Sequence, residues 1–75
     1  MRFTISRNLT NLATITAISY SDAADKYARK TYGRKCISRR TTGEHGKSGY
    51  FQAYAPVVKR EGGGLSSIGE PFHVQ

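Results

Sequence analysis

Glu44 and His45 are the adjacent residues of this chain whose types suit acid–base chemistry, because a carboxylate and an imidazole can each accept or donate a proton. They lie between Gly43 and Gly46, on a segment that we expect to be a loop, where neighbouring side chains are poorly oriented for catalysis. No nucleophile or third orienting residue is evident beside them. We therefore expect no catalytic residue here, and no enzyme.

Metal chemistry is not expected either. The single cysteine, Cys36, lies in a run that alternates apolar and polar residues, and the histidines are not clustered. Such residues give none of the ligand spacings of a zinc site. We expect Cys36 to be a small buried core residue, His73 to face solvent or a polar side of the sheet, and the chain to need no cofactor.

Binding chemistry is better represented, in an alternating run of aromatic and amide residues. Tyr50, Gln52 and Tyr54 should share one face of a strand, while Phe51 and Ala53 share the other and belong with the core. Tyrosines beside basic residues can stack on bases or anchor a protein interface. The opposite arrangement, with the helix packed on the tyrosine face, stays open at this point.

Positive charge is concentrated near this run. The formal net charge is +7, and seven of the twelve basic residues lie between Lys26 and Arg40, a stretch without any acid. Such a field attracts polyanions, whether nucleic acid or an acidic protein surface. The residues that we expect to contact a partner are Arg34, Lys35, Arg39, Arg40, Lys47, Tyr50, Gln52 and Tyr54.

One helix and several strands are expected to position these residues. Residues 22–32 repeat apolar side chains at helical spacing, with Ala24, Tyr27, Ala28 and Thr31 inward and Asp25 among the outward residues. Ser19 with Asp22 has the Ser-x-x-acid spacing of a helix start, and Ser21 followed by Asp22 offers a second possible cap. Gly33 suits a left-handed cap at the other end.

Strands are predicted at 3–6, 34–41, 48–55 and about 68–74, and 12–18 is a second strand or a continuation of the first. Pro56 should end a strand or lie at its edge, and the segment from Lys59 to Gly64 should be a mobile connection. The fold class predicted is α+β, an antiparallel sheet of three to five strands with one helix packed on one face.

The length of 75 residues is enough for a single domain, 1–75, which buries only about 60% of its unfolded surface. A core that small leaves little room for a cleft that would take a small-molecule substrate. No run approaches the roughly 18 apolar residues of a membrane span, so we expect a cytoplasmic protein without a membrane partner.

The second half of the chain resembles small phage-encoded anti-CRISPR proteins that block type I-E Cascade, the CRISPR surveillance complex. The residues that carry this resemblance are Arg40, Thr42-Gly43-Glu44, Ser48-Gly49, Phe51-Gln52-Ala53-Tyr54, Gly69 and Pro71-Phe72-His73-Val74. The resemblance implies an inhibitor made in the host bacterial cytoplasm, which binds Cas protein subunits of a type I Cascade, or its helper nuclease, and prevents target DNA from being engaged or cut. Type I-E, I-F and I-C complexes all remain candidates.

Two other functions stay open. A small basic phage protein could bind DNA or RNA directly, and an inhibitor with a charge of +7 could have incidental DNA affinity. A structural or virion interaction protein is the third alternative.

Overall fold

The structure is a computed structural model that describes residues 1–58 and 63–75. Its fold is α+β, with one helix packed against a five-stranded antiparallel sheet, as the sequence predicts. The elements are β1 (Arg2–Arg7), β2 (Thr10–Thr16), α1 (Tyr20–Tyr32), β3 (Ile37–Thr42), β4 (Gly49–Val58) and β5 (Gly63–Val74). Within the described residues, no helix is long and apolar enough to cross a membrane.

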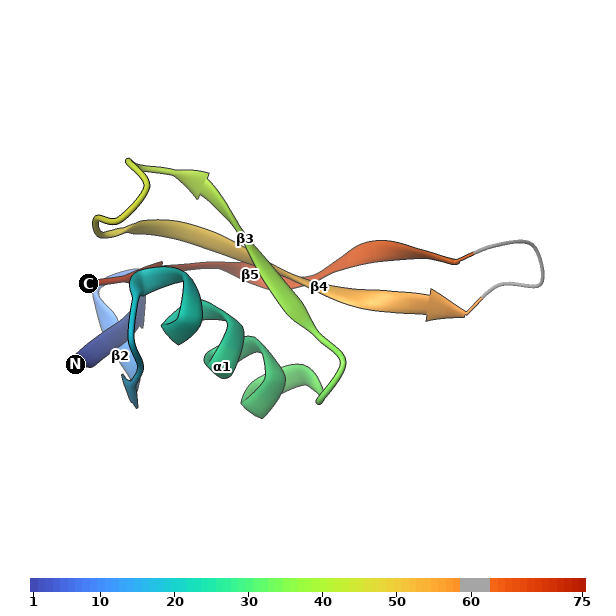
Figure 1. Ribbon diagram of the computed structural model, residues 1–75, viewed down its shortest axis with the longest axis horizontal. Coiled ribbons are helices and arrows are strands. Elements are labelled where there is room, and N and C mark those ends of the chain that lie inside the picture. Colours follow the sequence, from blue (N-terminus) through green and yellow to red (C-terminus); the bar gives the residue numbers. More distant parts are fainter. Residues whose placement is uncertain (59–62) are drawn as a thin grey trace.

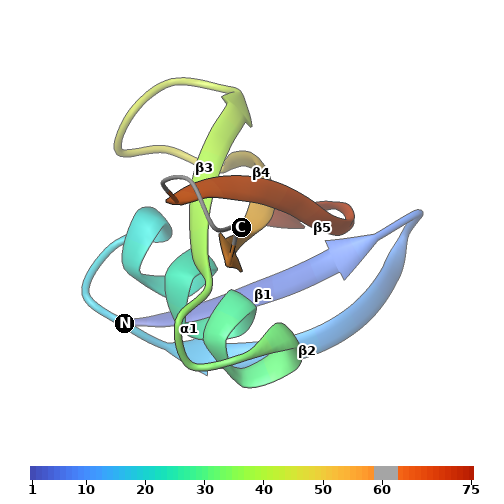
Figure 2. The same cartoon turned by 90° about the vertical axis from the view of Figure 1, so that its right-hand side faces the viewer.

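The sheet has the strand order β2-β1-β5-β4-β3, so the strand that comes last in the sequence is the central one. β1 with β2 and β3 with β4 form two antiparallel hairpins, and β5 joins them by pairing with β1 on one side and β4 on the other. Figures 1 and 2 show α1 lying across one face of this sheet. The opposite face, here called the outer face, has no helix over it in the described part of the chain.

The predicted start of α1 is confirmed, although the helix begins at Tyr20 rather than Asp22. The Asp22 amide donates to the Ser19 hydroxyl at 3.1 Å, and the Asp22 carboxylate accepts from the Ile18 amide at 3.2 Å. The predicted left-handed cap is wrong, because Gly33 has φ 149° and ψ 156°. The chain straightens there and leads directly into the turn before β3.

Two predicted positions on the helix also need correction. Thr31 is exposed and does not belong to the inner face, where Ala23 is buried instead. Asp25 does not lie outside, because its carboxylate accepts hydrogen bonds from the amide and hydroxyl of Ser38 at 2.8 and 2.7 Å. This pair attaches α1 to the edge strand β3.

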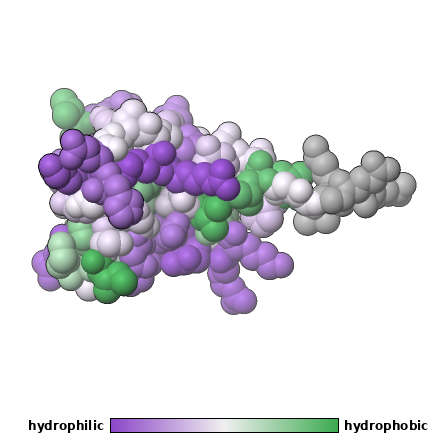
Figure 3. Space-filling view, turned by 45° about the horizontal axis from the view of Figure 1, so that its top comes forward, coloured by the Kyte–Doolittle hydropathy of each residue, from purple (hydrophilic) through white to green (hydrophobic). Residues whose placement is uncertain are grey.

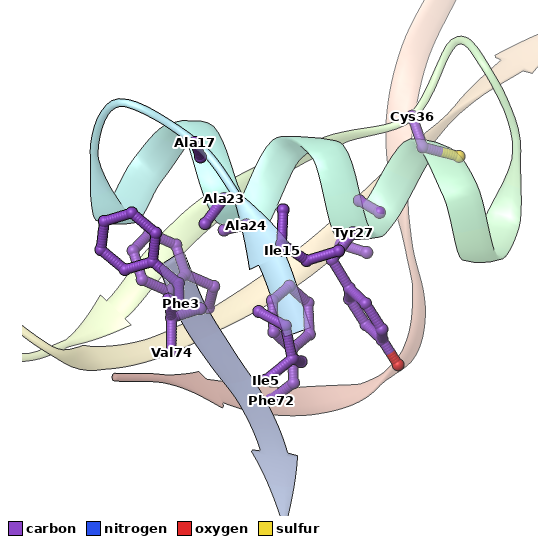
Figure 4. Packing of buried hydrophobic residues seen from close by; sticks show 13 residues of the cluster. Phe3, Ile5, Ile15, Ala17, Ala23, Ala24, Tyr27, Cys36, Phe72 and Val74 are labelled. Atoms are coloured by element: carbon purple, nitrogen blue, oxygen red, sulfur yellow. The ribbon is translucent and has the colours of Figure 1, made fainter. Parts of the chain in front are cut away.

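The core lies between α1 and the sheet (Figure 4), and its largest fully buried side chains are Phe51, Phe72, Ile5 and Val74. The helix contributes mainly alanines, which let it approach the strands closely, and Tyr27, whose ring lies 4.8 Å from that of Phe72. The predicted burial of Cys36 is confirmed, since 4% of the residue is exposed.

Beyond the helix, β4 and β5 continue together as a two-stranded arm, which gives the molecule its longest extent of 39 Å (Figure 1). Pro56 does not end β4 but lies past Tyr54, the last residue of β4 that pairs with β3, where a missing amide hydrogen is tolerated. β5 begins at Gly63, earlier than predicted, because the register with β4 continues along the arm. The predicted mobile connection lies partly outside the described residues, at 59–62.

Candidate partner-binding surface

The outer face of the sheet brings together aromatic and basic side chains from three strands. Phe51 and Phe72 point into the core, so their chain neighbours Tyr50 and His73 point outward, and their rings lie 4.8 Å apart. Arg39 of β3 lies over the Tyr54 ring, 5.6 Å from its centroid. We call Arg39, Tyr50, Tyr54 and His73 the outer-face cluster.

The cluster is accessible. Tyr50 is 48% exposed and Arg39 is exposed, whereas Tyr54 and His73 are half-buried by their neighbours. The predicted arrangement, with the tyrosines outside and Phe51 inside, is therefore the one observed. The alternative in which α1 covers the tyrosines is wrong.

Gln52, predicted to stand between the tyrosines as a contact residue, is buried. The register of β4 against β5 shifts between Phe51 and Ala53, and Gln52 has no residue opposite it in β5. The Gln52 side-chain amide donates to the carbonyls of Ala53, Ile68 and Gly69 at 3.1, 3.0 and 3.1 Å. It fills this irregularity in the sheet and does not offer a contact to a partner.

Two further residues, Arg7 and Tyr32, contact the irregular part of β5. Arg7 donates from Nε to the Pro71 carbonyl at 3.2 Å and from Nη2 to the Glu70 carbonyl at 3.0 Å. Gly69 has φ 69°, and the Tyr32 ring occupies the space that a side chain at this position would need. These contacts fix the backbone beside the outer-face cluster.

Arg40 was predicted as a partner contact, but its side chain serves the fold. Its guanidinium lies over the core-facing Phe51 ring at 4.7 Å and donates from Nη2 to the Lys47 carbonyl at 2.8 Å. A second contact, from Nη1 to the Ser48 carbonyl, is 3.5 Å long. Arg40 thus closes the loop between β3 and β4 on the face opposite Arg39.

The remaining predicted bases lie at opposite ends of β3. Arg34 and Lys35 are exposed in the turn between α1 and β3. Lys47 is exposed in the loop after β3, where it pairs with Glu44 at 3.1 Å. The structure therefore places Arg39 and the tyrosines together, with Arg34 and Lys35 at one end and Lys47 at the other.

The positive charge of Arg34, Lys35 and Arg39 is not neutralised by the acids that the structure describes. Asp22, Glu44 and Glu70 form ion pairs with Lys26, Lys47 and Arg7, respectively. Asp25 is engaged by Ser38. Much of the hydrophilic surface in Figure 3 belongs to the compact part of the molecule that carries these bases.

His73 belongs to the outer-face cluster but is not among the contact residues predicted from the sequence. Its alternation with Phe72 and Val74 places it on the polar face of a strand, and this expectation is confirmed. Its contact with Tyr50 depends on the pairing of β4 with β5, which the local sequence does not reveal.

Glu44 and His45 lie on the exposed loop between β3 and β4, where the Glu44 carboxylate faces Lys47. Among residues 1–58 and 63–75, no group of three or more His, Cys, Asp or Glu side chains could hold a metal ion. The outer-face cluster is thus the site on which a functional proposal can be based.

A scan against models of protein families finds no match for the chain, and a search of curated proteins finds no similar sequence.

Proposed function

We propose that this protein is a phage inhibitor that binds a type I CRISPR surveillance complex in the host cytoplasm and blocks engagement or cleavage of target DNA. It acts by binding, without catalysis or a cofactor. The resemblance of residues 40–54 and 69–74 to anti-CRISPR proteins supports the choice of target. The observation that supports a binding surface here is the exposed Arg39 held over the half-buried Tyr54 ring, beside bases that the described acids leave unneutralised.

The mechanism we propose is competition with DNA. The subunits that receive DNA are positively charged along the DNA path, so a basic protein would not bind in the path itself. It would bind to acidic side chains beside the path and obstruct the entry of DNA from there. Arg39 supplies a planar donor group that is already held by stacking, and this lowers the entropy lost on binding. Arg34 and Lys35 add attraction at the rim, which acts mainly on the association rate.

The test is retention of purified type I-E, I-F and I-C complexes on the immobilised protein, with labelled target DNA in a parallel binding assay. We expect one subtype to be retained and to lose target-DNA binding. Tyr54→Ala should weaken retention by about 2 kcal/mol, roughly thirtyfold, because an aromatic anchor is lost. Arg39→Glu should weaken it further by placing a negative charge against acidic groups.

Arg2→Glu is the matched control, because it makes the same charge change at an exposed residue of β1, on the far side of β5 from β3 and β4. It should leave binding nearly unchanged. Arg40 is not a useful target, because its loss would disturb the loop that it closes. Retention of no subtype, or equal effects of the Arg2 and Arg39 variants, would contradict the proposal.

Direct nucleic-acid binding is the second candidate, and the outer-face cluster is the observation that favours it. An aromatic pair, Tyr50 with His73, and a cation–π pair, Arg39 over Tyr54, lie on the outer face and resemble the stacking surfaces that bind single strands. This function predicts binding to free oligonucleotides, with log affinity falling linearly as log salt rises. It also predicts a loss of about 1–3 kcal/mol for Tyr50→Ala. Fluorescence anisotropy with single- and double-stranded oligonucleotides at physiological salt separates the two functions.

A further inference from the structure

The two edges of the sheet differ sharply in how they are protected, and β2 is the open one. Exposed edge strands invite pairing with another chain, and proteins usually block them with charges, bulges or covering elements. The segment from Asn8 to Ser21, which includes all of β2, contains no charged residue. In a chain with net charge +7 this is an unusual stretch.

The opposite edge, β3, carries the usual protection. The amide of Ser38 is occupied by the Asp25 carboxylate at 2.8 Å. The register shifts between Arg40 and Thr42, and Arg39 adds an exposed charge. A second strand could not easily pair along β3.

The free hydrogen-bonding groups of β2 can be identified from its neighbours. Thr4 exchanges backbone hydrogen bonds with Gln75, at 2.7 and 3.0 Å, so its amide and carbonyl point away from β2. Thr14 is directly opposite Thr4, and in an antiparallel ladder both members of such a pair point away from each other. The amide and carbonyl of Thr14 therefore point outward, at the free edge.

Thr16 follows the same alternation. Its carbonyl accepts a hydrogen bond from Lys26 Nζ at 3.1 Å, which places that carbonyl on the outer side of β2. This is the one contact that the described residues make to the outward groups of Thr14 and Thr16. Figure 2 shows β2 at the margin of the sheet, with β1 on its inner side.

Exposed apolar side chains also gather in and around β2. Of the six large hydrophobic residues that are exposed in the described chain, four lie in β2 or next to it. These are Met1 (76% exposed), Leu9 (103%), Leu12 (39%) and Ile18 (85%). Met1 lies on the β1 side of β2, because its carbonyl accepts from the Ala17 amide at 2.8 Å, so the other three residues are the ones nearer the free edge.

We propose that β2 pairs antiparallel with β2 of a second copy of this chain, so that two five-stranded sheets join into one continuous sheet. The distribution of charge favours a second copy of the chain as the partner of β2. Two copies with charge +7 repel each other, and the β2 edge is the place where they can meet with least repulsion. The residues of β2 are uncharged, and the one base that reaches this edge, Lys26, is paired with Asp22 at 3.5 Å, so the edge offers little excess charge to an acidic partner.

Symmetry supports the same choice. Antiparallel pairing of one strand with itself is two-fold and closes after two copies, with Thr14 near the axis. The two outer-face clusters then lie on one extended sheet, at its far ends. This proposal stands independently of the function proposed above.

The experiment is sedimentation velocity of the full chain, from low micromolar to near-millimolar concentration. We expect the mass to rise from 8.3 kDa towards twice that value. Thr14→Lys should abolish the rise, because it places two like charges at the axis. Thr42→Lys, which adds the same charge to the other edge strand, should leave it intact. A monomer at every concentration, or a dimer that tolerates Thr14→Lys, would overturn the proposal.

Hydrogen exchange of the unmodified protein gives a second test that does not depend on a variant folding. The Thr14 amide should exchange fast in dilute solution and become protected as the protein concentration rises. We expect its exchange rate to fall by about tenfold, which is the effect of adding one backbone hydrogen bond between strands. The Ile15 amide, which alternates to the β1 side, should be protected throughout. Fast exchange of Thr14 at all concentrations would exclude the pairing.

Discussion

Gln52 shows how a single side chain can support an irregular sheet. Its amide donates to three carbonyls beside the shift in register between β4 and β5, and the residue is buried. A buried carbonyl left without its donor lowers stability by about 1–3 kcal/mol, roughly twice what an average hydrogen bond contributes. Gln52 therefore belongs to the stability of the fold, although its neighbours in the sequence belong to the surface.

Gln52→Leu should lower the free energy of unfolding by about 1–2 kcal/mol, because the partly buried carbonyls of Ile68 and Gly69 lose their donor. Urea denaturation followed by circular dichroism measures this difference. Gln75→Leu makes the same chemical change at an exposed side chain and should have little effect. Equal stability of the two variants would contradict the role given to Gln52.

Alternation in the sequence predicts which face each residue of β4 occupies, and the burial of Phe51 and exposure of Tyr50 agree with it. It cannot predict the burial of Gln52, because this depends on a register shift against a strand sixteen residues away in the chain. The prediction that Arg40 contacts a partner is wrong for a similar reason, since its guanidinium binds the backbone of the loop beyond β3. The alternation of residues in a strand predicts the face of the sheet to which a side chain points, but not the distant groups that a long side chain contacts.

At the scale of elements, α1 depends on a well-formed start. The Ser19 hydroxyl accepts from the Asp22 amide, which the first turn leaves free, and the Asp22 carboxylate accepts from the amide of Ile18 just before the helix. The Ser-x-x-acid spacing made this predictable. Its exact geometry differs from the usual capping box, because Asp22 binds the amide of Ile18 rather than that of Ser19.

This start makes the stability of the protein depend on pH in the acid range. The hydrogen bond from the Ile18 amide lowers the pKa of Asp22 below its ordinary value of 3.8, and Lys26 lowers it further. Because the pKa is lowered on folding, the stabilisation is complete above 3.8 and is lost as the pH falls through the lower, folded value.

We expect Asp22→Asn to flatten the fall in melting temperature below pH 4, relative to the unmodified protein, while a difference in stability at pH 7 persists. Thermal unfolding at a series of pH values measures this. Ser19→Ala should instead cost about 1 kcal/mol at every pH, because its hydroxyl does not titrate. Parallel pH profiles for the Asp22 variant and the unmodified protein would contradict this account.

For the whole molecule, the excess of positive charge opposes the compact state. Arg29, Lys30, Arg34 and Lys35 follow one another around the end of α1 without a carboxylate partner among the described residues. The ion pairs that do exist are at the surface and each contributes little. Repulsion should therefore outweigh them in the response to salt.

Raising NaCl from low concentration to about 0.5 M should stabilise the protein by about 1 kcal/mol, roughly 4–8 °C in Tm for a domain of this size. Calorimetry measures the shift. A variant with Lys30, Arg34 and Lys35 replaced by Gln should show a smaller shift, because less repulsion remains to be screened. A fall in Tm with salt would show that the ion pairs dominate.

The place of β5 also bears on how the protein reaches its fold during synthesis. β1 and β2 can form one hairpin as soon as they are made, and β3 and β4 can form a second. Within the sheet, these two hairpins are joined only by β5. β5 follows all of these elements in the chain, and its pairing joins Ile5 to Val74. Contacts between residues so distant in sequence form slowly. Until β5 emerges from the ribosome, the two hairpins share no backbone pairing, and the packing of α1 on both of them is the contact that can hold them together.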